Sequence, residues 1–195
     1  RGLGDVYKRQ VLLDGDTGML LDSRTLSHKS FVKGPTAASR VQDPAKILEF
    51  TTELAKEMIK KHGRPDSIGM TGQMHGMLYV DCSGMAVSPL YTWQDGNGNE
   101  LTKDGRSYAE VISEAAGTAA SGYGLTTHYY LQKKSLIPKN AEKLVTISDY
   151  IAMRLCESSE AVIARDMAAS WGGYDLEIGD FCREELETLG VDSSY

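Results

Sequence analysis

Two short clusters of polar residues in the first half of the chain carry the side chains best suited to chemistry. The first is Gln73-Met74-His75, between glycines, and the second is Trp93-Gln94-Asp95. An indole face packs against the C–H side of a sugar, while imidazole, amide and carboxylate groups bond to its hydroxyls. These residue types therefore indicate a small polar ligand site. Two strand ends with a packing Trp would give the same pattern, so the spacing alone leaves both interpretations open.

Short apolar runs around these clusters predict the strands that would hold them. Met77–Val80 and Ala86–Thr92 are predicted to pair as two strands joined by a turn over residues 81–84. Ser67–Thr71 is predicted to be the strand that leads into Gln73. Strand ends with polar groups and small neighbours are where α/β proteins hold small ligands.

The first part of the chain predicts a hairpin followed by a helix. From Val11 onwards, two apolar runs flank the glycine-rich turn Asp14–Gly18, which is typical of a β-hairpin. Asp43 and Pro44 then supply the N-cap and the first position of a helix that Gly63 ends. Hairpin, helix and strand in this order predict an α/β domain with a mixed β-sheet flanked by helices.

The second half predicts shorter elements. Ser107 has capping-box spacing with a Glu three residues later, and a helix is expected over residues 128–137. Residues 144–147 are predicted to form a strand, after which Ser148 caps a helix. A last helix is expected over residues 180–190.

Composition excludes several functions. The formal net charge of −6 and the pI near 5.2 argue against a nucleic-acid partner, because no basic face is present. No apolar run is long enough to cross a membrane. The three cysteines show no metal-ligand spacing and no disulfide framework, so a reducing cytoplasm is expected.

No metal site is expected either. Asp14 and Asp16 lack the further oxygen ligands of a calcium loop, so turn chemistry explains them better. Asp95, Asn97 and Asn99 match the first ligands of such a loop, but the glycine and the closing glutamate that the loop requires are missing.

The first ten residues differ from the remainder of the chain. R-G-L-G-D-V-Y-K-R-Q has no periodicity and runs into an apolar strand without a turn. It is similar to the translation of a sequencing adaptor, so residues 1–10 are interpreted as a non-native scar. A basic N-terminal arm is the alternative. The expected domain then covers residues 11–195, with both of its ends cut.

Five motifs give the chain a resemblance to the N-terminal domain of the FGGY carbohydrate kinases, over essentially all of residues 11–195. The two most specific are G-M-T-G-Q-M-H-G-M at 69–77 and T-W-Q-D-G-N-G-N at 92–99. The supporting motifs are G-Y-G-L-T-T-H-Y-Y at 122–130, I-S-D-Y-I at 147–151 and A-A-S-W-G-G-Y-D-L at 168–176. The sedoheptulokinase-like branch resembles the chain more closely than the xylulokinases do.

This resemblance implies a ribonuclease H-like, actin-like ATPase-type fold, with ATP and sugar bound in the cleft between two domains. It implies that Met74 and His75 touch the sugar, that Trp93 packs against it and that Asp95 reaches one of its hydroxyls. The implied activity is the ATP- and Mg-dependent phosphorylation of a ketose, such as sedoheptulose or xylulose, on a terminal hydroxyl. A homodimer is the expected assembly of the parent enzyme.

Two parts of the family pattern are not found. The phosphate-binding turn with its Asp is expected before Val11, and the general-base Asp is expected beyond Tyr195. This chain alone is therefore expected to bind sugar without catalysis, since phosphoryl transfer needs a positioned nucleotide and a base. Loss of the first strand is expected to leave an exposed sheet edge that favours dimers. The alternative function is a stand-alone, non-catalytic sugar-binding module.

Overall fold

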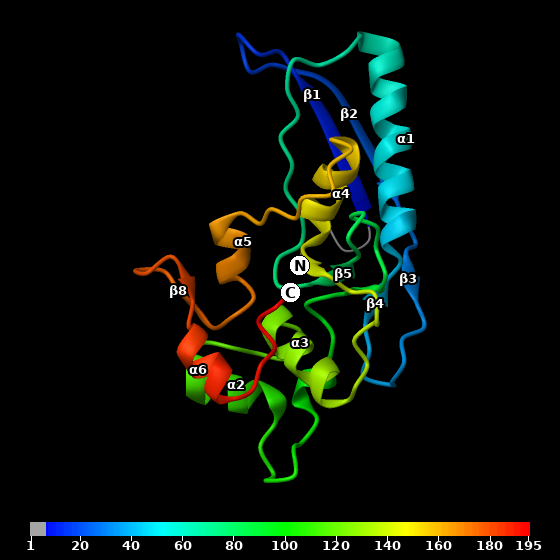
Figure 1. The fold of residues 1–195 in the computed structure, drawn as a ribbon. Helices are drawn as coiled ribbons and strands as arrows, with labels where there is room; N and C mark the ends of the chain where they lie inside the picture. The colour runs from blue at the N-terminus through cyan, green and yellow to red at the C-terminus, as the bar shows by residue number, and fades with distance from the viewer. Residues whose placement is uncertain (1–6) are drawn as a thin grey trace.

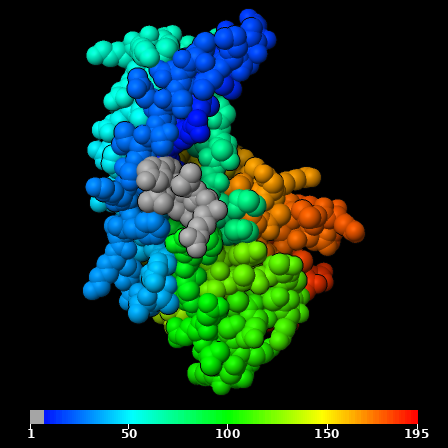
Figure 2. Space-filling view, turned by 180° about the vertical axis from the view of Figure 1, so that it is seen from behind, coloured from blue at the N-terminus to red at the C-terminus, as the bar shows by residue number. Residues whose placement is uncertain are grey.

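A computed structural model describes residues 7–195 of the chain, and Figure 1 shows its arrangement. A long hairpin and helix α1 form one end of the molecule, and helices α2, α3 and α6 form the other. The same two ends are seen from behind in Figure 2. Short strands lie between them and connect the two ends.

The N-terminal hairpin forms as predicted and begins earlier than expected. Strand β1 (Tyr7–Leu13) pairs antiparallel with strand β2 (Leu20–Ser27). In the turn, the Asp14 carboxylate accepts hydrogen bonds from the Thr17 N–H at 2.8 Å and from the Thr17 hydroxyl at 2.7 Å. Turn chemistry therefore accounts for Asp14. Residues 7–10, which the sequence assigns to a scar, are part of β1, while residues 1–6 lie outside the described residues.

Helix α1 (Pro44–His62) confirms the capping prediction. The Asp43 carboxylate accepts hydrogen bonds from the backbone N–H groups of Ala45 and Lys46, and Gly63 follows the helix with a φ of 86°. The helix buries Ile47, Leu54 and Met58, which lie on one face because they are spaced at helical intervals.

The short strands form small antiparallel sheets. Strands β3 (Phe31–Val32), β4 (Val41–Gln42) and β6 (Leu90–Tyr91) make one of these sheets, and β5 (Leu78–Val80) pairs with β7 (Lys143–Val145) in another. The predicted pairing of residues 77–80 with 86–92 is present as two antiparallel bridges. They join Val80 to Ala86 and Met77 to Tyr91.

The strand predicted over Ser67–Thr71 does not form. Within residues 7–195, no backbone N–H group of residues 67–72 donates a hydrogen bond to another backbone group. Ile68 is 65% exposed and Met70 is 40% exposed. A strand exists only where a neighbour completes its hydrogen-bond ladder, and among the described residues none does so here. The mixed sheet expected from the sequence is therefore present as separate antiparallel pieces.

Helices α2 and α3 lie in the lower part of the molecule as drawn in Figure 1. Helix α2 (Tyr108–Ala116) has the predicted capping box, in which both hydrogen bonds between Ser107 and Glu110 form. Helix α3 (Gly124–Lys133) begins before the predicted start at residue 128 and ends before the predicted end at residue 137. Its eight residues from Gly124 to Leu131 are all buried, so tertiary packing rather than an amphipathic pattern defines it.

The last elements also differ in their bounds. Helix α4 (Ile147–Leu155) is capped by the Thr146 hydroxyl instead of Ser148. After helix α5 (Arg165–Ala169), the strands β8 (Tyr174–Asp175) and β9 (Asp180–Phe181) form a small hairpin. This hairpin takes up the start of the predicted last helix, so α6 spans only Arg183–Thr188.

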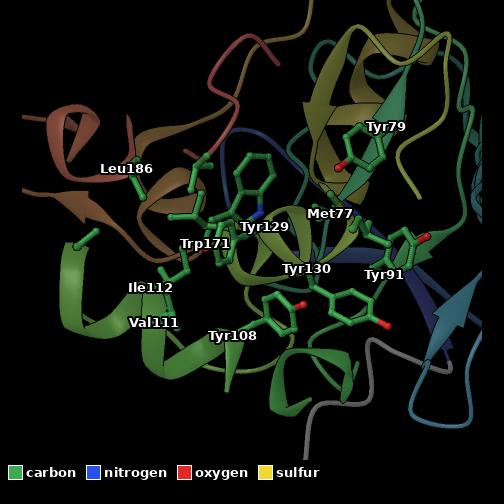
Figure 3. Close-up of a cluster of buried hydrophobic side chains, with 14 of the residues drawn as sticks. Met77, Tyr79, Tyr91, Tyr108, Val111, Ile112, Tyr129, Tyr130, Trp171 and Leu186 are labelled. Atoms are coloured by element: carbon green, nitrogen blue, oxygen red, sulfur yellow. The ribbon is translucent and has the colours of Figure 1, made fainter. Parts of the chain in front are cut away.

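Two apolar clusters hold these elements together. The larger one contains Trp171 and aromatic side chains from β5, β6, α2 and α3. Figure 3 shows it extending from Trp171 near the helices to Tyr79 and Tyr91 near the strands. The smaller one packs α1 and α4 against β5 and β7, through Ile47, Leu78 and Val145. Within β5, Tyr79 lies in the first cluster while Leu78 and Val80 lie in the second, so this strand joins the two. Among residues 7–195, no helix combines the length and the apolar character needed to span a membrane.

Candidate functional site

The two polar clusters lie side by side because Met77, which follows the first cluster, is hydrogen-bonded to Tyr91, which precedes the second. The Met77 N–H donates to the Tyr91 carbonyl at 3.0 Å, and the Tyr91 N–H donates to the Met77 carbonyl at 2.9 Å. One residue beyond this pair, Gly76 lies so close that an added Cβ would be 2.6 Å from the Tyr91 oxygen and 3.3 Å from the Thr92 Cα. Antiparallel pairing therefore brings His75 and Trp93 to the same edge.

His75 has a backbone conformation that few residues adopt. Its φ is 70°, and the Gly76 N–H donates to the Met74 carbonyl at 2.8 Å, so the backbone closes a three-residue turn around it. A residue other than glycine with this φ stores strain, and such residues cluster at functional sites.

Three contacts hold His75 in place. Its backbone N–H donates to the Ser170 hydroxyl at 3.1 Å, and its ring Nδ1 lies 2.5 Å from the Ser170 carbonyl oxygen. The ring also stacks on Tyr123, with centroids 4.2 Å apart and planes inclined by 12°. A carbonyl oxygen can only accept, so Nδ1 carries a proton. In the neutral ring Nε2 is then an acceptor, and it has no hydrogen-bond partner within residues 7–195.

Trp93 lies in a tight turn that closes when the Asp95 N–H donates to the Thr92 carbonyl at 2.9 Å. Its side chain remains 46% exposed. Gly122 packs directly against this turn, since an added Cβ would lie 2.1 Å from the Trp93 carbonyl oxygen. The neighbouring residue, Tyr123, stacks on His75. The pair Gly122-Tyr123 therefore connects the two predicted site residues.

Met74 completes the exposed part of the site. Its side chain is 48% exposed, and it immediately precedes the strained His75. A thioether chain is apolar and adaptable, so it suits the wall of a small-ligand site. The structure thus brings Met74, His75 and Trp93 to one surface region.

Asp95 is placed differently from the sequence expectation. It is 2% exposed, and both of its carboxylate oxygens already accept hydrogen bonds from the protein. Burial raises the pKa of Asp95, against the opposing effect of the N–H groups of Arg40 and Asn97. Three N–H groups already use most of its acceptor sites and solvent hardly reaches it, so a sugar hydroxyl would reach this carboxylate only after rearrangement.

Sequence reasoning missed three residues that build the site. Tyr123 and Ser170 orient His75, and the buried Trp171 donates its indole N–H to the Gly76 carbonyl at 3.1 Å. The glycines on either side of Tyr123 were the available signal. An added Cβ on Gly124 would lie 2.5 Å from the Trp171 ring, so both glycines allow close approach.

The described residues do not fit a metal centre. Among residues 7–195, no group of three or more His, Cys, Asp or Glu side chains is arranged to hold a metal ion. The phosphate-binding turn expected before Val11 is not seen in residues 7–10, which form a strand instead. We therefore assign no nucleotide or metal contact to the described residues.

Comparison with solved structures defines the class of fold. The ligand-bound xylulose kinase from Lactobacillus acidophilus superimposes with a TM-score of 0.78 at 21% identity, covering 97% of this chain and 39% of that enzyme. The glycerol kinase of Plasmodium falciparum with ADP gives a TM-score of 0.72 at 16% identity, covering 95% of this chain and 39% of that one. The chain therefore has the ribonuclease H-like, actin-like fold of the N-terminal domain of these kinases.

Comparison of sequences defines the family. Residues 3–195 match the FGGY family of carbohydrate kinases, N-terminal domain, and the chain belongs to this family. The sedoheptulokinase of Mus musculus is 29% identical over 181 residues, which are 83% of this chain and 36% of the mouse protein. The chain thus spans little more than a third of the length of that relative.

Proposed function

We propose that this chain is the sugar-binding part of an ATP-dependent kinase that phosphorylates a ketose on a terminal hydroxyl. Sedoheptulose and xylulose are the proposed substrates, because the mouse relative is a sedoheptulokinase and a structural neighbour is a xylulose kinase. The family to which the chain belongs consists of carbohydrate kinases.

The observation that carries this proposal is the state of His75. Its strained backbone, its Nδ1 contact with Ser170 and its stacking on Tyr123 hold one ring nitrogen as an acceptor. A fixed acceptor beside a half-exposed indole is an arrangement that suits a polyhydroxylated ligand. Strain at such a position is expected where geometry matters more than stability.

The proposed contacts follow from side-chain chemistry. A sugar hydroxyl donates to His75 Nε2, while the C–H face of the carbon chain packs on the Trp93 indole. Met74 provides an apolar wall that excludes water from the same side. These three contacts together hold the sugar in one orientation, which places its terminal hydroxyl for reaction.

ATP is the proposed phosphoryl donor, since enzymes of this family are ATP-dependent and one structural neighbour contains ADP. Mg²⁺ is proposed as its companion, because it neutralises the charge that develops on the transferred phosphoryl group. Among residues 7–195, no group of three or more His, Cys, Asp or Glu side chains is arranged to hold a metal ion. None of these residues is proposed as the general base or as part of the phosphate-binding turn. We therefore expect the isolated chain to bind sugar without hydrolysing or transferring phosphate.

Further properties of the parent enzyme are proposed on the same basis. Its partner is a small-molecule sugar, and no nucleic acid or membrane partner is proposed, in line with the net charge of −6. A cytoplasmic location and a homodimer complete the proposal.

Calorimetric titration of the purified chain with sedoheptulose, xylulose, gluconate and glycerol tests the proposal. We expect binding of at least one ketose and a loss of about tenfold or more in affinity for His75→Ala, because a directional hydrogen bond is removed. His62→Ala is the matched control, since His62 lies on α1 and pairs with Asp22. No binding by the folded chain, or equal losses for both variants, would contradict the proposal.

A further inference from the structure

Asp95 lies at the centre of a buried hydrogen-bond network. Its Oδ2 accepts a hydrogen bond from the Arg40 N–H at 3.0 Å. Its Oδ1 accepts two from Asn97, one from the backbone N–H at 3.1 Å and one from the side-chain Nδ2 at 2.8 Å. Three N–H groups thus converge on one carboxylate that solvent hardly reaches.

The side chain of Asn97 extends the network to residues 36–39. Its Oδ1 accepts a hydrogen bond from the Thr36 hydroxyl at 2.6 Å, and its Nδ2 donates to the Ser39 hydroxyl at 3.1 Å. The Ser39 and Thr36 hydroxyls are 2.9 Å apart. Since the Thr36 proton goes to Asn97, the Ser39 proton goes to Thr36, and every donor in the network has an acceptor.

Backbone hydrogen bonds join the same two segments. The Thr92 N–H and hydroxyl both donate to the Arg40 carbonyl, at 3.1 and 2.8 Å. The Gly96 N–H donates to the Ala38 carbonyl at 3.0 Å. These bonds lie on both sides of Trp93 in the sequence, so residues 92–97 are held against residues 36–40 with Trp93 in the turn between the anchors.

The network also reaches the segment that carries Tyr123. The Ser121 hydroxyl donates to the Asp95 carbonyl at 2.8 Å, and Gly122 packs on the Trp93 carbonyl. Through Tyr123, which stacks on His75, the Trp93 turn and the imidazole are connected by adjacent residues.

From this geometry we infer that Asp95 is a positioning residue, which fixes the Trp93 turn at the sugar site without touching the sugar. The inference deepens the proposed function and rests on it for the identity of the ligand. A carboxylate is required because only acceptors fit opposite three N–H groups. An asparagine would turn one NH2 group towards an N–H donor.

The energetics agree with this role. Burial raises the pKa of Asp95 in spite of its hydrogen bonds, so ionised Asp95 lowers the free energy of unfolding near neutral pH. A buried charge that does not stabilise the fold is expected where geometry is needed for binding. The network thus fixes the Trp93 turn through a carboxylate whose ionised form burial disfavours and whose hydrogen bonds oppose that effect.

Fluorine NMR of the chain labelled with 5-fluorotryptophan tests the inference directly. The chain contains two tryptophans, so Trp93→Phe assigns both resonances. We expect Asp95→Asn to shift or broaden the Trp93 resonance, to leave Trp171 unchanged, and to lower ketose affinity about tenfold. Asp81→Asn is the matched control, because half-buried Asp81 also accepts turn N–H groups, from Ser83 and Met85, and lies outside the site.

The outcomes separate this inference from the proposed function, since the fluorine signal is read without sugar. An unchanged Trp93 resonance in folded Asp95→Asn overturns the positioning role, and a loss of sugar affinity with that unchanged resonance would indicate a direct contact. Ser39→Ala serves if Asp95→Asn does not fold. It removes one hydrogen bond of Asn97, and a smaller shift confined to the Trp93 resonance is then expected, whereas no shift contradicts the inference.

Discussion

At the scale of single residues, His75 and Gly122 show how the backbone determines the site. The backbone of His75 has a φ of 70°, at which glycine would be less strained. Its imidazole contacts Ser170 and Tyr123. Gly122 lies where even a methyl group would collide with the Trp93 carbonyl. His75 is therefore strained in its backbone, whereas Gly122 has no side chain because the Trp93 carbonyl occupies that space.

The role of Gly122 predicts a difference between two similar substitutions. Gly122→Ala and Gly117→Ala both place a Cβ at a φ near 85°, but an added Cβ at Gly117 meets nothing within 4 Å. Gly117→Ala should cost roughly 1–3 kcal/mol, because its φ of 85° and ψ of −156° lie in a region that is essentially restricted to glycine. Gly122→Ala should cost roughly 2 kcal/mol more, because the Trp93 backbone must move.

Urea denaturation of both variants measures this difference. Equal midpoints for the two alanine variants would show that Gly122 is not packed against Trp93 as the structure describes.

At the scale of elements, strand neighbours decide what forms. Residues 77–80 and 67–71 both have the composition of strands. Within residues 7–195 only the first segment has strand partners, in β7 and in residues 86–91. Helix α1 forms as its sequence predicts, because its cap, its first Pro and its final Gly are local signals. Helix α3 could not be bounded from its sequence, because all its faces from Gly124 to Leu131 are buried.

Amide hydrogen exchange should reveal the difference between the two apolar segments. We expect amides of residues 67–72 to exchange quickly at neutral pH, because among residues 7–195 they have no backbone acceptor. Amides of β5 should be strongly protected by their ladder to β7. Mass spectrometry of peptides from each segment checks this, and slow exchange in residues 67–72 would mean that they pair with a strand after all.

At the scale of the whole molecule, a buried histidine ties the C-terminal residues to the core. The His128 Nε2 lies 2.9 Å from the Asp192 carbonyl, so it donates, and Nδ1 accepts the Tyr79 hydroxyl proton at 2.7 Å. Tyr195 packs edge-on against both rings. Burial lowers the pKa of His128 below its model-peptide value of 6.5, with Asp192 opposing the shift.

This lowered pKa predicts the direction of a pH effect. Below pH 6.5 the unfolded chain binds a proton at His128 before the folded chain does, so its contribution to stability is lost as pH falls. The loss continues until pH passes the folded pKa, at up to about 1.4 kcal/mol per pH unit. Above pH 6.5 the contribution is complete.

His128→Gln isolates the effect, because a glutamine can accept from Tyr79 and donate to Asp192 without titrating. Thermal melts of both proteins between pH 7.5 and 5 should show a smaller decline in Tm for the variant. Parallel declines would assign the pH dependence to other groups.

Local elements and family membership could be predicted from the amino-acid sequence. Capping residues predict α1 and α2, and the turn at Asp14 predicts the hairpin. Q-M-H-G with W-Q-D-G indicates the FGGY family, and the family comparison confirms this membership. These signals are carried by neighbouring residues, so they can be read without knowing the fold.

The assembly of the site, in contrast, depends on contacts between segments that are distant in the sequence. Ser170, Tyr123 and Arg40 lie far from His75, Trp93 and Asp95 in the sequence, and no local pattern relates them. The exposure of Trp93 and the burial of Asp95, two residues apart, were equally unpredictable. A tight turn separates the environments of adjacent side chains, and which one is buried depends on the distant segment that packs against the turn.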